Sequence, residues 1–317
     1  MNSIQTIQDT FDVNAIYAHK LHSLTKGDNY IEEVRRTISE KPKPIVKWVG
    51  GKRQLLSQFR LLNLYPPSGF NPNKSTYYEP FVGGAAVFFD LLPEKAFLSD
   101  LNNDLVITYN VIKNDVDELI DSLKKHVYEK EYFLRVRKLD PRKLSKIEIA
   151  SRFIYLNRTC FNGMYRVNKS GQFNVPFGRY SNPQICDELN LRRASKALKN
   201  IEINCEDYKE VLNKAKKGDF IYFDPPYYPI NSTSSFTSYT PNAFLDKEQI
   251  ELRETFAQLS DRGCYVMLSN SDTPFINKIY SELKNKGVKI TKILAGRAIN
   301  SKASRRGKIT EVLITNY

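Results

Sequence analysis

Hydrophobic and polar residues form two kinds of pattern along most of the chain. Short apolar runs predict strands at residues 76–81, 95–99, 201–205, 220–223 and 264–268. Longer stretches with apolar residues about 3.6 positions apart predict helices at 85–92, 105–123 and 246–260. Strands that alternate with helices predict an α/β fold with a doubly wound, mostly parallel sheet.

Two further segments interrupt this alternation. Apolar and polar residues alternate in 288–294 and again in 309–315, and a basic loop joins the two segments. This pattern predicts an antiparallel edge hairpin. Residues 126–200 lie between the second and third strands, are too long for a crossover loop, and show helical spacing at 146–157. We therefore expect an inserted helical subdomain at 126–200. The catalytic domain would be 41–125 with 201–317, and residues 1–40 an extension of unknown role.

The charge is concentrated in the part of the chain that carries these elements. The 317 residues include 48 Lys and Arg and 35 Asp and Glu, for a net charge of +13. Residues 1–40 hold four of the basic and six of the acidic residues, so the remainder carries +15. A basic folded body makes nucleic acid the leading class of partner, although an anionic surface would give the same balance.

Several classes of site are disfavoured by the sequence. The four cysteines are far apart, without a Cys-x-x-Cys pair, which argues against both zinc and disulfides. All three histidines lie before residue 127, which argues against histidine acid–base chemistry near the later motifs. The chain has no run of 18 apolar residues and no signal-peptide pattern at its start, so we expect a reduced, cytoplasmic protein without a membrane span.

The most informative stretch follows the predicted strand 220–223 and consists of Asp224, Pro225, Pro226 and Tyr227. Ligands of open α/β sheets bind outside the carboxyl ends of the strands. The carboxylate of Asp224 and a proline carbonyl can accept hydrogen bonds from an exocyclic amine, and Tyr227 can stack on a planar base. The stretch therefore predicts a binding site for an amino group attached to an aromatic ring. Two prolines are also common in ordinary turns, which is the alternative explanation.

A second candidate site follows the first two strands. Gly83 and Gly84 close the first strand and open a helix, where glycines let a ligand approach the backbone. Asp100 ends the second strand, a position from which an acid binds ribose hydroxyls. The stretch lacks the Gly-x-Gly-x-x-Gly dinucleotide pattern, so an adenosine-bearing cofactor without a pyrophosphate, such as S-adenosylmethionine, fits. Turn glycines and a helix-capping acid would be the structural alternative.

These motifs, in this order, resemble the Dam family of DNA adenine-N6 methyltransferases, and most closely the enzymes that methylate GATC. The matched stretches are Lys47-Trp48-Val49-Gly50-Gly51-Lys52, Glu79-Pro80-Phe81-Val82-Gly83-Gly84, Ser99-Asp100-Leu101-Asn102, Asn162-Gly163-Met164-Tyr165-Arg166, Phe173-Asn174-Val175-Pro176-Phe177-Gly178-Arg179-Tyr180 and Asp224-Pro225-Pro226-Tyr227. The resemblance covers about residues 43–317. Ala85 departs from the glycine of some members, and residues 1–40 match nothing.

The resemblance implies a fold, an activity and a set of site residues. The fold would be that of S-adenosylmethionine-dependent methyltransferases, and the reaction a methyl transfer to an adenine flipped out of duplex DNA, without a metal and by a monomer. Asp224, Pro225, Pro226 and Tyr227 would be catalytic. The cofactor would be bound by Trp48, Lys52, Phe81, Gly83, Asp100, Asp207 and Phe223. The DNA would be bound by Lys47, Asn162, Arg166, Tyr180 and Arg305.

The sequence leaves rival functions open. One is methylation of another amine, such as cytosine N4, an RNA adenine or a protein glutamine, although Asp before Pro-Pro-Tyr favours adenine. The absence of a Pro-Cys dipeptide argues against cytosine C5 methylation. The other rival is a DNA-binding module that kept the fold without activity. The sequence does not decide whether the protein belongs to a restriction–modification system or acts alone.

Overall fold

The computed structural model describes residues 41–168, 170–230, 244–296 and 308–317. Residues 42–317 form one compact unit, and residues 1–41 are grouped apart from it. Arg305 and the loop predicted to join the edge hairpin lie outside the described residues, as does the extension 1–40. Among the helices that the structure describes, none is both long enough and apolar enough to cross a membrane.

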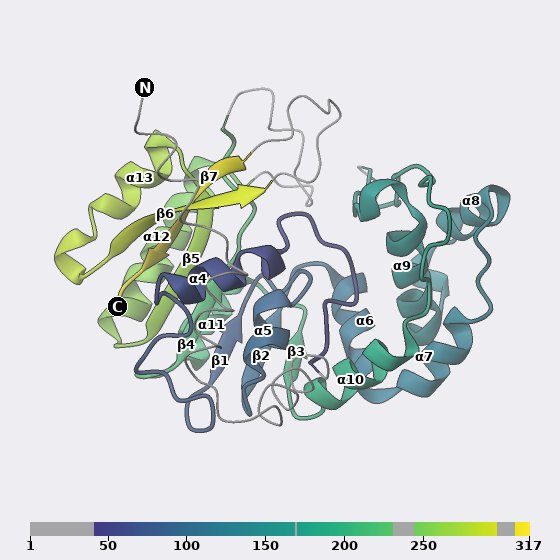
Figure 1. The fold of residues 1–317 in the computed structure, drawn as a ribbon, viewed down its shortest axis with the longest axis horizontal. Coiled ribbons are helices and arrows are strands. Elements are labelled where there is room, and N and C mark those ends of the chain that lie inside the picture. Colours follow the sequence, from purple (N-terminus) through teal and green to yellow (C-terminus); the bar gives the residue numbers. More distant parts are fainter. Residues whose placement is uncertain (1–40, 169, 231–243, 297–307) are drawn as a thin grey trace, which may run out of the picture. The chain divides into compact units, whose positions relative to one another are not determined.

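A seven-stranded mixed sheet forms the centre of this unit (Figure 1). Its strands are β1 (Tyr77–Glu79), β2 (Ala96–Ser99), β3 (Glu202–Asn204), β4 (Phe220–Phe223), β5 (Tyr265–Ser271), β6 (Lys289–Gly296) and β7 (Lys308–Thr315). Their order is β3-β2-β1-β4-β5-β7-β6. Strands β1 to β5 are parallel, whereas β7 pairs antiparallel with both β5 and β6. The predicted doubly wound sheet with an antiparallel edge is confirmed.

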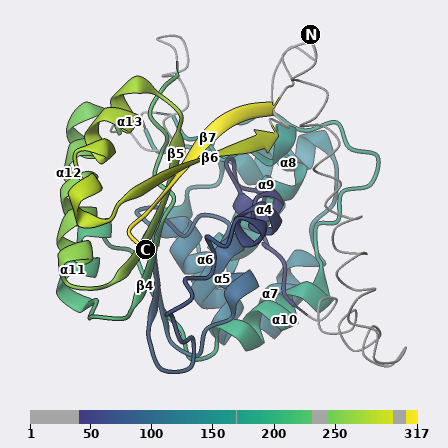
Figure 2. The same ribbon diagram turned by 60° about the vertical axis from the view of Figure 1, so that its left-hand side comes forward.

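Helices cover both faces of the sheet (Figure 2). The α-helices of the described residues, including those that lie away from the sheet, are α4 (Leu56–Leu61), α5 (Ala86–Leu91), α6 (Asn103–Asn114), α7 (Val116–Leu123), α8 (Lys130–Lys138), α9 (Lys146–Thr159), α10 (Glu188–Leu198), α11 (Val211–Lys214), α12 (Asp246–Asp261) and α13 (Pro274–Ser281). Short 3-10 turns occur at η1 (Lys52–Gln54), η2 (Pro141–Lys143), η3 (Phe161–Gly163), η4 (Tyr208–Glu210) and η6 (Lys284–Lys286).

The strand β4 shows how the pattern of the sequence builds two cores. All four of its residues are buried, so the strand reads as a continuous apolar run. Because successive side chains point to opposite faces, Phe220 and Tyr222 enter the core shared with α5 and α6. Ile221 and Phe223 enter the core formed with α12 and α13.

The single helix predicted at 105–123 is wrong, because the structure has two helices there. Asp115 has φ −133° and ψ 42°, outside the helical region, and separates α6 from α7. Its N–H bonds to the carbonyl of Val111 at 2.8 Å, and its carbonyl accepts from Leu119 at 3.0 Å. Asn and Asp compete with helical hydrogen bonds, so the pair Asn114 and Asp115 favours this break.

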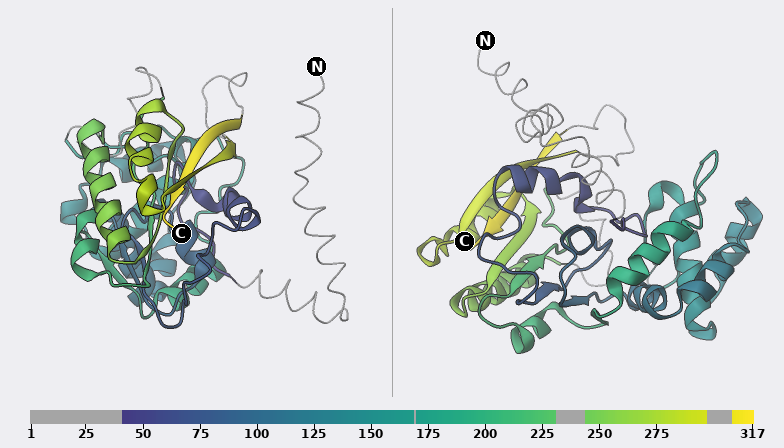
Figure 3. Two further views of the ribbon diagram at one scale, coloured as in Figure 1. Left: turned by 90° about the vertical axis from the view of Figure 1, so that its left-hand side faces the viewer. Right: turned by 60° about the horizontal axis from the view of Figure 1, so that its bottom comes forward.

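The predicted helical spacing at 146–157 is confirmed by α9. A capping box starts this helix, since Ser145 Oγ accepts from the N–H of Glu148 and the Glu148 carboxylate accepts from the N–H of Ser145. The helices α8 and α9 lie beyond the β3 edge of the sheet (Figures 1 and 3). The assignment of residues 126–200 as a separate recognition subdomain stays a prediction.

The sheet topology fixes where a ligand can bind. From β1 the chain adds β2 and β3 on one side, whereas β4 and β5 lie on the other. The loops after β1 and β4 therefore diverge at the same edge, and ligands of open α/β sheets bind at such a switch point, outside the carboxyl ends of the strands. The glycine turn at Gly83 and the loop that starts at Asp224 meet there.

Candidate active site

Asp224 is the first residue after β4, and its carboxylate is held by a lysine from a distant part of the chain. Lys52 Nζ lies 2.7 Å from Oδ1 and 2.8 Å from Oδ2 of Asp224. The side chain of Lys52 is 3% exposed and that of Asp224 is 20% exposed. Burial raises the pKa of Asp224 to about 6, and the charge of Lys52 acts in the opposite direction. The carboxylate is therefore ionised and able to accept hydrogen bonds near neutral pH.

Tyr227 is fixed from two sides. Its ring lies under the ammonium of Lys52, with 4.9 Å between Nζ and the ring centroid. Its hydroxyl donates to Oε2 of Glu311 on β7 at 2.9 Å. Burial raises the pKa of Tyr227, which keeps the phenol protonated as a donor. A ring held this way offers a fixed face for a planar base.

The backbone of the proline loop is anchored by buried amides. Gln249 Nε2 donates to the Pro226 carbonyl at 3.0 Å, and Gln249 Oε1 accepts from Asn270 Nδ2 at 3.0 Å. Asn270 Oδ1 accepts from the N–H of Tyr228 at 3.1 Å. Gln249 and Asn270 are fully buried. The loop after β4 is thus tied to α12 and β5, which preorganises it.

The glycine turn after β1 is closed by Asp100. The N–H of Gly83 donates to Asp100 Oδ2 at 3.1 Å, and the N–H of Asn102 donates to Oδ1 at 3.0 Å. Burial raises the pKa of Asp100, and these backbone donors counter the shift. Gly83 has φ +44°, and a Cβ there would lie 2.6 Å from Cδ1 of Trp48. The structure thus brings together Gly83, Asp100 and Trp48, and their role in binding a cofactor stays a prediction.

Aromatic rings surround Phe81, the next predicted cofactor residue. Phe81 stacks on Tyr208 with 5.3 Å between centroids and meets Phe223 edge-on at 6.3 Å. Phe244 lies perpendicular to it at 5.9 Å. Asp207 is exposed and caps η4, where its carboxylate accepts from the N–H of Lys209 at 2.9 Å. Phe81 is therefore packed against an aromatic cluster, and Asp207 is the exposed neighbour of Tyr208 in the chain.

The predicted DNA-binding residue Lys47 lies next to the end of α9. Its Nζ is 4.5 Å from the centroid of the Tyr180 ring. Its backbone is held by Asn157 through two hydrogen bonds of 2.8 Å. The hydroxyl of Tyr180 donates to the Cys160 carbonyl at 3.0 Å. Lys47 and Tyr180 therefore lie in contact, and their role in binding DNA stays a prediction.

Two further predicted residues lie exposed in the same part of the chain. Asn162 has φ +55° in the turn η3. Arg166 is exposed, and its Nε donates to Asn174 Oδ1 at 2.7 Å. Phe161, beside Asn162, was not among the predicted site residues and is 46% exposed.

Some residues at the site are brought there by the tertiary structure. Glu311, Gln249 and Asn270 lie on β7, α12 and β5, and only the sheet brings them to the loop after Asp224. No motif marks Gln249 or Asn270, whereas Glu311 ends the stretch from Ser304 that also resembles the Dam family.

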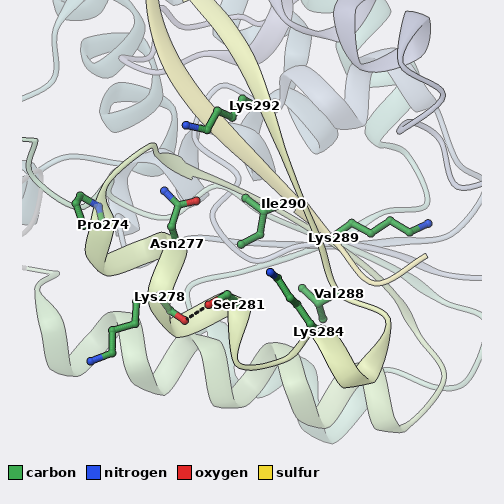
Figure 4. Close-up of a pocket in the computed structure, with 9 residues that line it drawn as sticks. All are labelled: Pro274, Asn277, Lys278, Ser281, Lys284, Val288, Lys289, Ile290 and Lys292. Carbon is green, nitrogen blue, oxygen red and sulfur yellow. Dashed lines mark hydrogen bonds between the residues drawn. The ribbon is translucent and has the colours of Figure 1, made fainter.

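A surface hollow elsewhere contains none of the predicted site residues. It has a volume of about 670 Å³ and is lined by α13, η6 and β6 (Figure 4). Four lysines surround it, but their side chains point in different directions. Lys292 pairs with Asp272 at 2.8 Å, and Lys289 donates to the Tyr317 carbonyl at 3.1 Å. The hollow therefore does not gather positive charge at one point.

The fold and the site define a class of enzyme, the methyltransferases with a doubly wound sheet and an antiparallel edge. The family described as D12 class N6 adenine-specific DNA methyltransferase matches residues 48–299. The chain belongs to this family. The resemblance to the Dam enzymes is confirmed, and the rivals without methyltransferase activity or with another amine as target are set aside.

Known relatives cover nearly the same length. The chain is 44% identical over 283 residues to "Type II methyltransferase M1.LlaDCHI" of Lactococcus lactis subsp. cremoris, covering 87% of this chain and 95% of the relative. It is 45% identical over 293 residues to "Type II methyltransferase M.MjaIII" of Methanocaldococcus jannaschii, covering 87% and 99%. It is 32% identical over 278 residues to "DNA adenine methylase" of Escherichia coli (strain K12), covering 86% and 95%.

Proposed function

We propose that the protein transfers a methyl group from S-adenosylmethionine to N6 of an adenine that has been flipped out of duplex DNA, within the sequence GATC. The observation that carries this proposal is the ionised, largely buried carboxylate of Asp224 beside the fixed ring of Tyr227, at the switch point of the sheet. The enzyme would act as a monomer in the cytoplasm.

The residues at the glycine turn fit the methyl donor. Asp100 keeps acceptor capacity for ribose hydroxyls, because a carboxylate has about four lone-pair sites and two backbone donors occupy two of them. Phe81 and Phe223 offer apolar surface, and Trp48 covers Gly83. With Lys52 and Asp207 they form the proposed cofactor-binding set. When bound, S-adenosylmethionine supplies an electrophilic methyl group on its sulfonium sulfur.

The chain's contribution is to hold the acceptor amine. An adenine amino group is a weak nucleophile because its lone pair is conjugated with the ring. Hydrogen bonds from N6 to Asp224 and to the Pro225 carbonyl favour a tetrahedral nitrogen and free that pair. Gln249 already occupies the Pro226 carbonyl, which supports Pro225 as the second acceptor. Tyr227 orients the base by stacking. The rate enhancement of methyl transfer therefore comes from the orientation of the base and from electrostatics.

The burial of Asp224 supports base flipping. Enzymes that act on an atom inside the stack take the base out of the duplex, because the target is otherwise out of reach. A carboxylate that is 20% exposed and lies at the switch point of the sheet needs the base brought to it. Lys47, Asn162, Arg166 and Tyr180, with Arg305, are the proposed DNA contacts.

Expression in a host that lacks adenine methylation, followed by sequencing of methylated DNA, tests this function. We expect N6-methyladenine at GATC with the wild-type protein and none with Asp224→Ala, whose DNA binding should stay near normal. Methylation of adenine in another sequence would refute the proposed recognition sequence GATC but not the proposed reaction. Turnover of more than a few per cent of the wild-type rate by Asp224→Ala would refute the role of the carboxylate.

A further inference from the structure

Two charged residues hold the amine-binding loop from different elements. Lys52 comes from η1, near the start of the described chain, and Glu311 comes from β7, near its end. Lys52 contacts Asp224, and Glu311 contacts Tyr227. The two residues that we assign to the adenine are thus held by a lysine and a glutamate from distant parts of the chain.

All the described polar contacts of the Lys52 ammonium lie within this site. Its ammonium donates to both carboxylate oxygens of Asp224 and to the Gly50 carbonyl. The same ammonium lies over the Tyr227 ring at 4.9 Å. Lys52 is 2% exposed, so little water competes for these donors. Removing it would leave Asp224 with a buried, unpaired charge.

The contact of Glu311 completes the arrangement. Tyr227 donates to Glu311 Oε2 at 2.9 Å, and this bond determines which way the ring faces. On β7, Glu311 is paired in register with Ser271 of β5, so its backbone position is set by the sheet. The ring of Tyr227 is therefore held at its hydroxyl by Glu311 and on its face by Lys52.

We propose that Lys52 and Glu311 are positioning residues for methyl transfer, with Lys52 orienting the Asp224 carboxylate and Glu311 fixing the ring of Tyr227. This inference rests on the proposed function of Asp224. It gives Lys52 a role beyond contact with the cofactor and adds Glu311 to the site.

The charges of the two residues act on Asp224 with opposite signs. The charged or titratable groups that face Asp224 are Lys52 from η1, Glu79 from β1, Tyr222 from β4, Tyr227 from its own loop and Glu311 from β7. Burial raises the pKa of Glu79 to about 8, so this carboxyl is largely neutral at pH 7. Both tyrosines have raised pKa values through burial and are neutral as well. Lys52 and Glu311 are the opposing charges, since Lys52 lowers the pKa of Asp224 and Glu311 raises it.

The signs give a distinctive result in a pH profile. The ionised form of Asp224 is the stronger acceptor for the N6 amine, so kcat/KM for DNA falls as pH drops through the pKa of Asp224, about 6. Lys52→Met should move this acidic limb to higher pH by about one pH unit or more, because a close opposite charge is lost. Glu311→Gln should move the limb to lower pH while its amide oxygen can still accept from Tyr227.

The experiment measures kcat/KM for a short duplex from pH 5 to 9 at saturating S-adenosylmethionine, and the Kd of that cofactor by calorimetry. Lys52→Met, Lys52→Arg and Glu311→Gln are compared with two matched surface variants, Arg53→Met and Glu282→Gln. Arg53 is the exposed neighbour of Lys52, and Glu282 pairs with Arg253 at the surface. Melting temperatures verify that each variant folds.

The proposal is supported if the acidic limb of kcat/KM shifts to higher pH in Lys52→Met and to lower pH in Glu311→Gln. The limb of Lys52→Arg should lie close to the wild-type pH. An unchanged limb in Lys52→Met, with only a weaker Kd for the cofactor, overturns it and leaves Lys52 a cofactor contact. If Lys52→Met does not fold, Glu311→Gln decides alone by the sign of its shift. Turnover in Asp224→Asn with the limb retained would instead show that the proposed function of Asp224 is wrong, whatever the Lys52 result.

Discussion

Asn157 holds the backbone of Lys47 with both ends of its amide. Oδ1 accepts from the Lys47 N–H at 2.8 Å, and Nδ2 donates to the Lys47 carbonyl at 2.8 Å. The same Nδ2 donates to the Gly163 carbonyl at 3.0 Å. One buried side chain near the end of α9 thus joins the loop before Trp48 to the turn that carries Asn162.

Replacing Asn157 by Ala should weaken both stability and DNA binding. It leaves buried backbone groups of Lys47 and Gly163 without partners, at a cost of about 1–3 kcal/mol. Asn190→Ala is a matched control, because Asn190 makes the same pair of bonds to Lys43, at 2.8 and 2.9 Å. Both variants should lose several degrees of melting temperature, but only Asn157→Ala should raise KM for DNA. Equal KM values would show that the contact serves stability alone.

Gly83→Ala should impair cofactor binding. Its new Cβ would lie 2.6 Å from Trp48 Cδ1 and 2.8 Å from Nε1, at a residue with φ +44°. Gly171→Ala provides the control, since Gly171 has φ +74° and no atom within 4 Å of the added Cβ. Both should carry about 1–2 kcal/mol of backbone strain. Calorimetry should show a weaker Kd for S-adenosylmethionine in Gly83→Ala only, and an equal Kd in the two variants would contradict the role of this turn.

Arg166→Ala should reduce discrimination at one guanine of the recognition site. The guanidinium is exposed and is oriented by Asn174 at 2.7 Å, and a bidentate contact to guanine provides about 1–3 kcal/mol. We expect kcat/KM on GATC to fall by roughly 10- to 100-fold, with a smaller loss on a site mismatched at that guanine. Arg142→Ala, which removes an exposed arginine paired with Asp140, controls for lost charge. A uniform loss on all sequences would make Arg166 a phosphate contact.

The stability of the folded protein should depend on pH through His126. Its ring nitrogens bond to Tyr132 at 2.8 Å and Ser151 at 3.0 Å, and burial lowers its pKa to about 4. The unfolded pKa is about 6.5, so the neutral form stabilises the fold above that pH, and the contribution is lost as pH falls towards 4. The drop in melting temperature from pH 7 to pH 4.5 should be smaller in His126→Gln than in wild type. Tyr132→Phe keeps the titrating group and should retain the full drop; equal drops in all three proteins would exclude His126 as the cause.

The sequence alone determined the class of fold and the local parts of the site. The apolar run of β4 and the rigid Asp224-Pro225-Pro226-Tyr227 stretch lie side by side in the chain, so their relation is readable without a structure. The glycine turn at Gly83 and the acid at Asp100 are likewise marked by position after a strand. Local patterns carry such information because backbone preferences and side-chain periodicity act over a few residues.

The tertiary structure decided which distant groups meet these parts. Lys52 and Asp224 are separated by 172 positions, and nothing in their local patterns marks them as an ion pair. Glu311, Gln249 and Asn270 reach the same loop only because β5 and β7 are adjacent in the sheet and α12 packs on it. The break at Asp115 was missed because the apolar spacing continues through it, whereas the backbone of Asp115 leaves the helical region there. Contacts between elements depend on strand order and packing, which no short stretch of sequence contains.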